Sequence, residues 1–129
     1  MPLSRAKRLF AVIEDDVAVL NSLQYVLEIQ GQEVCAFESA QAAIDSDRIM
    51  QADCLIIDYV LPDMDGLTML GILRRGGLAC PAVVIASNPT SRCRAAAEAA
   101  GAPLVEKPIM GRDLDDVLTR LLASSTRVN

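Results

Sequence analysis

Short apolar runs alternate along this chain with longer stretches in which apolar residues recur every three or four positions. The runs have the length of strands and are bounded by charged or turn-forming residues, a pattern typical of strands buried on both faces. They are Leu9–Ile13, Glu33–Phe37, Asp53–Asp58, Ala82–Ala86 and Leu104–Glu106. The stretch after each run predicts a helix, so the pattern indicates strands and helices in strict alternation.

The first and last predicted helices have the clearest apolar faces. The first has Asp15 or Asp16 as its N-cap and ends at Gly31, a residue that suits the position after a helix. Its apolar face consists of Val19, Leu20, Leu23, Val26 and Leu27. The apolar face of the last helix consists of Leu114, Val117, Leu118, Leu121 and Leu122.

The helices between them are delimited by capping residues and glycines. Ser39 begins a short alanine-rich helix, and Asp45-Ser46-Asp47 loosens its end. The next helix stops at Gly76-Gly77. Another alanine-rich helix spans Arg92–Ala100 and is ended by Gly101.

Strict alternation of strands and helices predicts a parallel sheet with right-handed crossovers, and hence a three-layer α/β fold. No internal repeat or change of composition divides the chain. We therefore expect a single domain over residues 1–129, with a core from about residue 8 to about residue 123.

Composition narrows the functional classes. Hydrophobic residues make up 52% of the chain and aromatic residues 3%, so the core must be aliphatic. The net charge of −5 argues against nucleic-acid binding through a basic surface, because phosphate contacts need Lys and Arg. No apolar stretch is long enough to span a bilayer, and no long apolar region follows the basic start of the chain, so neither a membrane span nor a signal peptide is expected.

The spacing of the cysteines does not support a metal site. Cys35, Cys54, Cys80 and Cys93 include no C-x-x-C pair, and the chain has no histidine, which excludes a Cys/His zinc site. We expect four buried thiols in a reducing, cytoplasmic environment.

Carboxylates follow two of the predicted strands at the point where each strand ends. Asp58 ends one apolar run, and Glu14-Asp15-Asp16 follows another. If the two strands are neighbours, these side chains meet at the edge of the sheet where open α/β folds bind ligands. Like charges in one pocket repel unless a cation binds them, and Mg²⁺ prefers such oxygen ligands. Taken singly, each acid has the alternative of a solvated loop residue or a helix N-cap.

With these acids, three further segments give the chain a family resemblance. They are Leu61-Pro62-Asp63-Met64-Asp65-Gly66, Ser87 after a strand, and Glu106-Lys107-Pro108. In this order and spacing the chain resembles the receiver domains of bacterial two-component response regulators, from about residue 8 to about residue 123. The resemblance implies a flavodoxin-like (βα)5 fold with strand order 2-1-3-4-5 and the site at the switch point between the first and third strands.

The resemblance also implies roles for the acids. Asp58 would be the phosphoryl acceptor. Asp15, Asp58 and the backbone carbonyl of Val60 would bind Mg²⁺ directly, and Glu14 would act mostly through a bound water. Asp16 falls just past the family's acidic pair, and we interpret it as a helix cap.

Two residues near the ends of later strands would contact the phosphoryl group. Lys107 would meet its oxygens as a compact positive charge, and the Lys107–Pro108 bond is one that many family members have in the cis form. Ser87 occupies the family's Ser/Thr position and would donate a hydrogen bond. The alternatives are a surface lysine in a turn and a serine serving turn chemistry.

Gly66, Asp63 and Asp65 have structural interpretations. Gly66 is expected to supply either a positive φ or a close approach of two backbone segments. Asp63 and Asp65 are expected to be solvated or to cap the next helix.

The chain departs from the family pattern where a conformational switch would act. Receiver domains commonly have Tyr or Phe three residues before the lysine, and this chain has Leu104. Ile109 stands where Phe is frequent. These departures leave the phosphorylation chemistry intact but put the usual aromatic switch in doubt.

The resemblance implies regulation rather than enzymatic turnover of an external substrate. The partners would be a histidine kinase or phosphotransfer protein and a downstream effector protein, with no nucleic acid and no membrane, and weak homodimers through the last helices occur in the family. Three alternatives remain: a phosphorylation-independent interaction domain with the same fold, a receiver fragment of a DNA-binding regulator or hybrid kinase, and an aspartyl phosphohydrolase. The last is disfavoured because Glu14-Asp15-Asp16 replaces the Asp-x-Asp motif of such enzymes.

Overall fold

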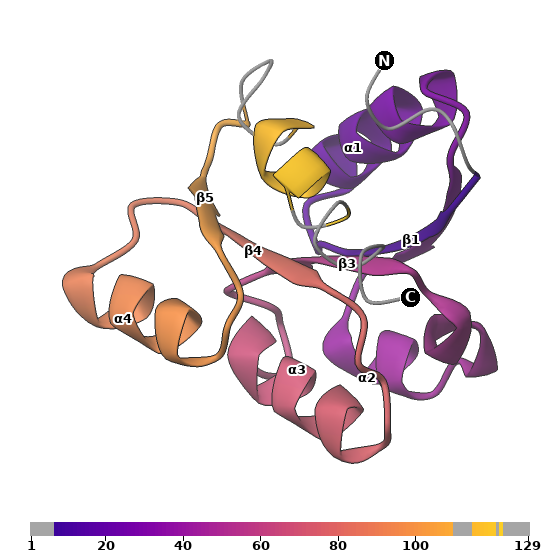
Figure 1. The fold of residues 1–129 in the computed structure, drawn as a ribbon. Helices are drawn as coiled ribbons and strands as arrows, with labels where there is room; N and C mark the ends of the chain where they lie inside the picture. The colour runs from indigo at the N-terminus through magenta and orange to yellow at the C-terminus, as the bar shows by residue number, and fades with distance from the viewer. Residues whose placement is uncertain (1–6, 110–114, 121, 123–129) are drawn as a thin grey trace.

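The structure, a computed structural model, describes residues 7–109, 115–120 and 122. Its strands form one parallel sheet in the order β2-β1-β3-β4-β5, as predicted (Figure 1). The strands are β1 (Leu9–Ile13), β2 (Glu33–Phe37), β3 (Cys54–Asp58), β4 (Ala82–Ala86) and β5 (Leu104–Glu106). The helices are α1 (Val17–Ile29), α2 (Ala40–Ile44), α3 (Gly66–Arg75) and α4 (Ser91–Ala99), and residues 115–120 are also helical.

Helices cover both faces of the sheet, and this makes the domain three layers thick. α1 and the helical residues after 115 lie on one face, and α2 and α3 lie on the other (Figure 1). Side chains alternate across a strand, so each central strand supplies both cores. Leu55 and Ile57 of β3 belong to the core beneath α2 and α3, whereas Cys54 and Ile56 belong to the core beneath α1.

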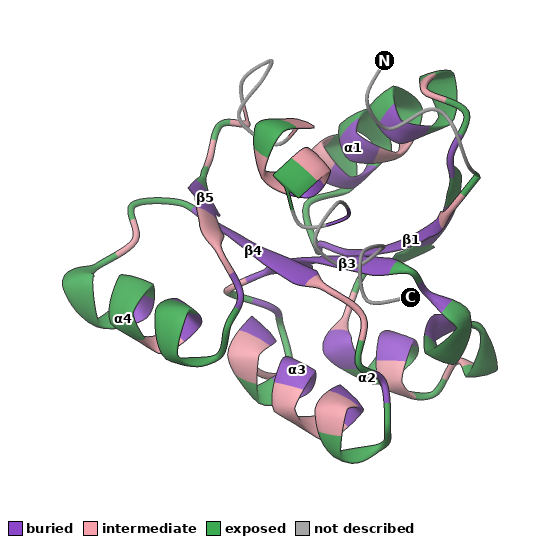
Figure 2. Ribbon diagram, in the orientation of Figure 1, coloured by how far each residue is buried: buried purple, intermediate pink, exposed green. Residues whose placement is uncertain are grey.

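The central strands are buried on both faces, as their continuous apolar sequences predicted. Every residue of β1, β3 and β4 is buried, which Figure 2 shows as an unbroken purple band. Among the residues that the structure describes, no helix is long and apolar enough to cross a membrane.

Helix ends follow the predicted chemistry. Asp16, Ser39 and Thr90 are the N-caps of α1, α2 and α4. Gly31 and Gly101 have φ values of +88° and +72°, the left-handed conformation that glycine adopts without steric cost.

Some details differ from the prediction. Asp47–Gln51 forms a 3₁₀ helix, η1, whose N-cap is Ser46, where only a loosened helix end was expected. α4 begins at Ser91 and β3 at Cys54, each one residue from its predicted start. Val26, assigned to the apolar face of α1, is 45% exposed. In the last helix, Leu118 and Leu122 are buried as expected, while Leu114 and Leu121 lie outside the described residues.

Candidate functional site

Three chain segments bring acidic and basic groups to one edge of the sheet. β1 and β3 are neighbouring strands, and Val12 lies opposite Ile56. Two residues further along each strand direction, on the same face of the sheet, are Glu14 and Asp58. Backbone hydrogen bonds continue past the strand ends and hold these segments in place. The N–H of Glu14 donates to the carbonyl of Phe37 at 3.0 Å, and that of Lys107 donates to the carbonyl of Ala86 at 2.8 Å.

Alternation along the strands puts the functional side chains on one face. Phe10 and Val12 lead to Glu14 in steps of two, and Cys54 and Ile56 lead to Asp58 in the same way. These four apolar residues all belong to the core beneath α1, as does Val105, two residues before Lys107. The strand period therefore directs both acids and the lysine toward the α1 side of the sheet edge.

The predicted acidic cluster is present. Carboxylate oxygens of Glu14, Asp15 and Asp58 lie within 4.8 Å of one another. Glu14 is fully buried and Asp58 is 4% exposed, whereas Asp15 is exposed. The site thus combines two carboxylates withdrawn from water with one at its mouth.

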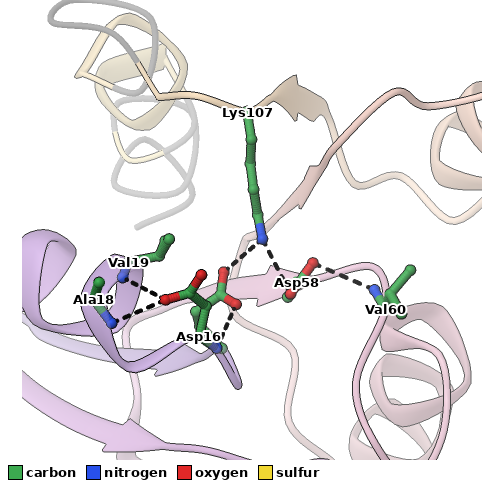
Figure 3. Close-up of polar contacts among 7 residues, drawn as sticks. Asp16, Ala18, Val19, Asp58, Val60 and Lys107 are labelled. Atoms are coloured by element: carbon green, nitrogen blue, oxygen red, sulfur yellow. Dashed lines mark hydrogen bonds and ion pairs between the residues drawn. The ribbon is translucent and has the colours of Figure 1, made fainter.

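Lys107 is the cation that these buried acids share. Its Nζ lies 2.8 Å from Oε1 of Glu14 and 3.2 Å from Oδ2 of Asp58 (Figure 3). The peptide bond that follows it, Lys107–Pro108, is cis. The alternative of a surface lysine in a turn is wrong, because the side chain reaches the acids from the end of β5.

Burial and pairing shift the pKa values of this pair. Burial raises the pKa of the Glu14 carboxyl above its ordinary value, and the bonds from Lys107 and from the Asp16 amide only partly offset that rise. Burial alone would lower the pKa of Lys107, but the contacts with Glu14 and Asp58 outweigh it and leave the lysine pKa raised. Lys107 is therefore a charged ammonium at neutral pH.

Asp16 serves the helix rather than the cluster, as predicted. Its Oδ1 accepts hydrogen bonds from the amides of Ala18 at 3.0 Å and Val19 at 3.4 Å, which caps α1 (Figure 3). Its own N–H donates to Oε2 of Glu14 at 3.0 Å. The capping residue thereby also orients the neighbouring buried carboxylate.

The loop after β3 folds closely around Asp58. The N–H of Val60 donates to Oδ1 of Asp58 at 3.3 Å, and the Val60 side chain is 68% exposed. Val60 and Asp65 form an antiparallel bridge, and the N–H of Gly66 donates to the carbonyl of Tyr59 at 2.7 Å. The loop therefore closes on itself directly beside the Asp58 carboxylate.

Gly66 is required by a close approach, one of the two reasons predicted for it. A Cβ at this position would lie 2.4 Å from the backbone oxygen of Asp58 and 2.7 Å from Cγ2 of Ile57. Its φ is not in the positive region that Gly31, Gly77 and Gly101 occupy. Of the two predicted reasons, the close approach therefore applies and the positive φ does not.

The two other acids of this loop cap different helices. Oδ1 of Asp65 accepts from the N–H of Thr68 at 2.8 Å and caps α3, the next helix, as predicted. Asp63 does not cap the next helix. Its carboxylate accepts from the amides of Ala40 at 3.1 Å and Gln41 at 2.8 Å, at the start of α2.

Ser87 follows β4 at the same edge of the sheet. It is exposed, and together with Lys107 it lines a cavity of about 860 Å³. The next residue, Asn88, has a φ of +46°, a conformation that Asn tolerates better than most residues. The Thr90 hydroxyl accepts from the N–H of Cys93 at 3.0 Å and caps α4. Ser87 is thus available to a ligand that also contacts Lys107.

The donor set fits Mg²⁺, which takes oxygen ligands and is commonly held by one or two carboxylates. The cluster consists only of oxygen ligands, and two of its three carboxylates are buried. Among the described residues, Oε1 of Glu14 has the Lys107 ammonium as its charged partner and no well-aligned hydrogen bond. The arrangement therefore carries more negative charge than its one cation neutralises.

Asp63 is the residue at this site whose role the sequence did not reveal. Its partners are 22 and 23 residues earlier in the chain, in a helix that does not follow its own strand. A loop aspartate is an ordinary helix-cap signal only for the helix that follows it. No local pattern could have identified this long-range contact.

Comparison with known proteins identifies the family. The sequence model of the family described as "Response regulator receiver domain" matches residues 10–119. The chain is 33% identical over 120 residues to the transcriptional regulatory protein KdpE of Mycobacterium tuberculosis. This match covers 92% of this chain and 51% of that protein. It is 29% identical over 117 residues to the transcriptional regulatory protein FixJ of Bradyrhizobium diazoefficiens, covering 90% of this chain and 55% of that protein. The chain therefore spans about half the length of these relatives.

Solved structures agree with the fold. A CheY-like response regulator receiver domain protein from Methanospirillum hungatei superposes with a TM-score of 0.85 at 23% identity, covering 96% of this chain and all of that one. A response regulator from Chloroflexus aurantiacus, described as putative, gives a TM-score of 0.82 at 26% identity, covering 92% of this chain and 99% of that one. The sheet order, the acidic cluster and the match over residues 10–119 agree, and the chain belongs to the response regulator receiver domain family.

Proposed function

We propose that Asp58 accepts a phosphoryl group in a Mg²⁺-dependent reaction, and that this chain is a signalling module regulated by that modification. The observation that carries the proposal is the position of Asp58: a nearly buried carboxylate within reach of two further acids and 3.2 Å from the Lys107 ammonium. It stands where the receiver fold, to which the chain belongs, has its sheet-edge site.

The chemistry is the transfer of a phosphoryl group from a donor to Asp58. An oxygen of the Asp58 carboxylate forms a bond to phosphorus while the bond from phosphorus to the donor breaks, and the bonding electrons leave with the donor. For a phosphohistidine donor, the leaving atom is an imidazole nitrogen. The negative charge of the phosphoryl oxygens is then brought beside two carboxylates, so positive charge must be supplied.

Two sources of positive charge are proposed. Mg²⁺, held by Asp15, Asp58 and the Val60 carbonyl with Glu14 acting through water, would neutralise charge on the transferring oxygens. Lys107 is already directed at the cluster and would move from Asp58 to a phosphoryl oxygen, because the modified Asp58 carries its charge further out. Ser87 would donate a hydrogen bond to another phosphoryl oxygen, because Ala86 pairs with Glu106 and Ser87 and Lys107 are the next residues of these two strands.

Intact-mass spectrometry after incubation with a small phosphoryl donor tests the assignment. Wild type is expected to gain one phosphoryl group with Mg²⁺ and none with EDTA, whereas Asp58→Asn gains none. Asp15→Asn is expected to lose the modification, and the neighbouring Asp16→Asn, which retains a capping oxygen for α1, is expected to keep it. Phosphorylation of Asp58→Asn at the wild-type rate would refute the acceptor assignment.

We further propose that the donor in the cell is a histidine kinase or phosphotransfer protein, that the chain acts in the cytoplasm, and that the modified state favours binding of an effector protein rather than catalysis of another reaction. Two regulators similar to this chain are named transcriptional regulatory proteins, which supports an output through regulation. Phosphorylation would then shift a two-state equilibrium of a binding surface.

One observation favours a second candidate, a phosphorylation-independent interaction domain. Leu104 packs half-buried against the core beneath α2 and α3, at the position where family members commonly have an aromatic residue. NMR spectra recorded with and without Mg²⁺ and beryllofluoride separate the candidates. Shifts that reach β4, α4 and β5 are expected for the phosphorylation switch, whereas an unchanged spectrum would favour the second candidate.

A further inference from the structure

The loop that carries Val60 is anchored at its base by its own backbone. Its ends are joined by the Val60–Asp65 bridge and by the 2.7 Å bond from the Gly66 amide to the Tyr59 carbonyl. Leu61 is buried in the core beneath α2 and α3, and Met64 is half-buried against the same core. These contacts fix the two ends of the loop, while Pro62 and Asp63 between them are exposed.

Asp63 anchors this exposed part to another element. One of its carboxylate oxygens accepts from the Ala40 amide at 3.1 Å and the other from the Gln41 amide at 2.8 Å. The helix's own N-cap, Ser39, accepts only from the Ala42 amide at 3.1 Å. Asp63 therefore satisfies the two amides at the start of α2 that Ser39 leaves without a side-chain acceptor.

α2 is a firm support for this contact. Ala40 and Ala43 are fully buried in the core that also contains Leu61. The bonds from the Gln41 and Ala40 amides lower the pKa of the Asp63 carboxyl, which keeps it ionised and its bonds charge-assisted at neutral pH. A short carboxylate held at both oxygens leaves little freedom for the loop residues beside it.

We propose that Asp63 is a positioning residue of the phosphorylation site, which fixes the loop of residues 59–65, and with it the Val60 carbonyl and the Asp58 carboxylate, by joining that loop to the start of α2. The consequence for Mg²⁺ rests on the proposed function. The consequence for the loop does not, because it follows from the contacts of Asp63 alone.

Three variants separate positioning from simple helix capping. Asp63→Ala removes both acceptors of the contact, and Asp63→Asn keeps one acceptor oxygen in the same place. Ser39→Ala is the matched control, because it removes a cap of the same helix without touching the loop. Each is compared with wild type by amide hydrogen exchange at Gly66, by Mg²⁺ titration followed in NMR spectra, and by urea unfolding.

Positioning predicts effects in the loop that capping does not. In metal-free protein, Asp63→Ala should accelerate exchange of the Gly66 amide by roughly tenfold relative to wild type. Exchange of the buried β3 amides, measured in the same samples, gives the contribution of global unfolding, which is subtracted. It should also weaken Mg²⁺ binding by roughly tenfold, the loss typical of residues that orient metal ligands. Asp63→Asn should recover part of both losses, and Ser39→Ala should lower the urea midpoint but change neither quantity.

The outcomes are distinct. If Asp63→Ala and Ser39→Ala lower the urea midpoint alike and leave Gly66 exchange unchanged, Asp63 is only a helix cap and the inference fails while the proposed function stands. If wild type itself binds no Mg²⁺, the proposed function fails, and Gly66 exchange still decides whether Asp63 positions the loop. Faster Gly66 exchange with unchanged Mg²⁺ affinity would overturn the metal consequence.

Discussion

At the scale of single residues, Lys107 compensates two carboxylates that have been taken out of water. Glu14 is fully buried and Asp58 nearly so, and each would be costly alone because burial disfavours its charged form. One ammonium within 3.2 Å of both makes the pair tolerable. The lysine thereby stabilises the metal-free site.

Lys107→Ala should therefore lower the free energy of unfolding of the metal-free protein by about 1–3 kcal/mol, since it leaves two buried acceptors without their cation. The raised pKa of Lys107 means that its stabilising contribution is complete below the ordinary lysine pKa and is lost only as the pH rises through the raised value, so the loss is fully expressed at pH 7. Mg²⁺ should reduce the difference between variant and wild type. Urea unfolding in EDTA and in Mg²⁺ measures both effects.

Arg94→Ala is a suitable control for this variant. Arg94 forms an ion pair with Glu106, next to Lys107, at 3.0 Å, but both side chains are about half exposed. Exposed pairs contribute about 0–1 kcal/mol, so little change is expected. Equal losses from the two variants would show that Lys107 has no special role in compensating the buried acids.

Gly66 provides a second test at this scale. Gly66→Ala should destabilise the domain by about 1–3 kcal/mol, because its Cβ would lie 2.4 Å from the Asp58 backbone oxygen and the strand end must shift. Gly71→Ala in the same helix should be neutral or stabilising by about 0.5–1 kcal/mol, since the nearest atom is the mobile tip of Arg75 at 3.6 Å. Urea midpoints of the two variants compare them directly, and a neutral Gly66→Ala would contradict the close approach.

At the scale of elements, α2 is a five-residue helix whose first two amides donate to a distant carboxylate, that of Asp63. Hydrogen bonds from the backbone amides of Gln41 and Ala40 lower the pKa of Asp63 below its ordinary value of 3.8. The stabilisation from this ionised cap is therefore fully present above the ordinary value and is lost as the pH falls through the lowered one. Because Asp63 is exposed, the change in stability that its protonation causes is expected to be small.

The difference in urea midpoint between wild type and Asp63→Asn should be constant from pH 7 to about pH 5 and should shrink as the pH falls below the ordinary carboxyl range. Asp45→Asn, at an exposed acid just after the same helix, serves as the reference for general acid effects. A difference that stays constant down to pH 2 would mean that the charge of Asp63 does not contribute.

Sequence patterns predicted most elements because the spacing of apolar residues and the positions of capping and turn residues indicated the same boundaries. Continuous apolar runs located β1 and β4 with their observed ends, and the Asp16 cap and Gly31 bounded α1. The cluster of Glu14, Asp15 and Asp58 followed from strand ends once the two strands were taken as neighbours. Its metal, its acceptor role and the part of Ser87 remain predictions.

The rest required tertiary information. η1 was missed because Asp45-Ser46-Asp47 consists of turn formers, and the same serine that suggested a loop caps a new helical turn. Asp63 is exposed, one of its two predicted states, but its contact with the start of α2 was not predicted because those partners are in a segment that only the folded chain brings near. Val26 has the spacing of a buried residue but is 45% exposed, because burial also depends on which elements pack against the helix at that position.

At the scale of the whole molecule, the cysteines report on the integrity of the core. Burial raises the pKa of the Cys54 thiol strongly, and it also raises that of Cys80, where the nearby Arg74 partly offsets the rise. Cys54 is fully buried in β3, whereas Cys80 is half-buried before β4. Reaction with an alkylating reagent needs an accessible thiolate, so the two residues differ in what exposes them.

In native protein at pH 8, iodoacetamide should modify Cys80 before Cys54, and Cys54 should react only at the rate of global unfolding. Peptide mapping by mass spectrometry over a time course measures the order. Cys80→Ala is the control, since it should remove the early product and leave the late one unchanged. Early modification of Cys54 would indicate that β3 opens locally.

The origin of the site in three separate strands has a consequence for how the protein is made. Glu14 and Asp58 are synthesised before Lys107, which directly follows β5, the strand that joins the sheet beyond β4. An unfinished chain holds the acids without their cation, and its sheet lacks the strand that aims that cation inward. The buried acids and their cation therefore come together only once β5 has joined the sheet.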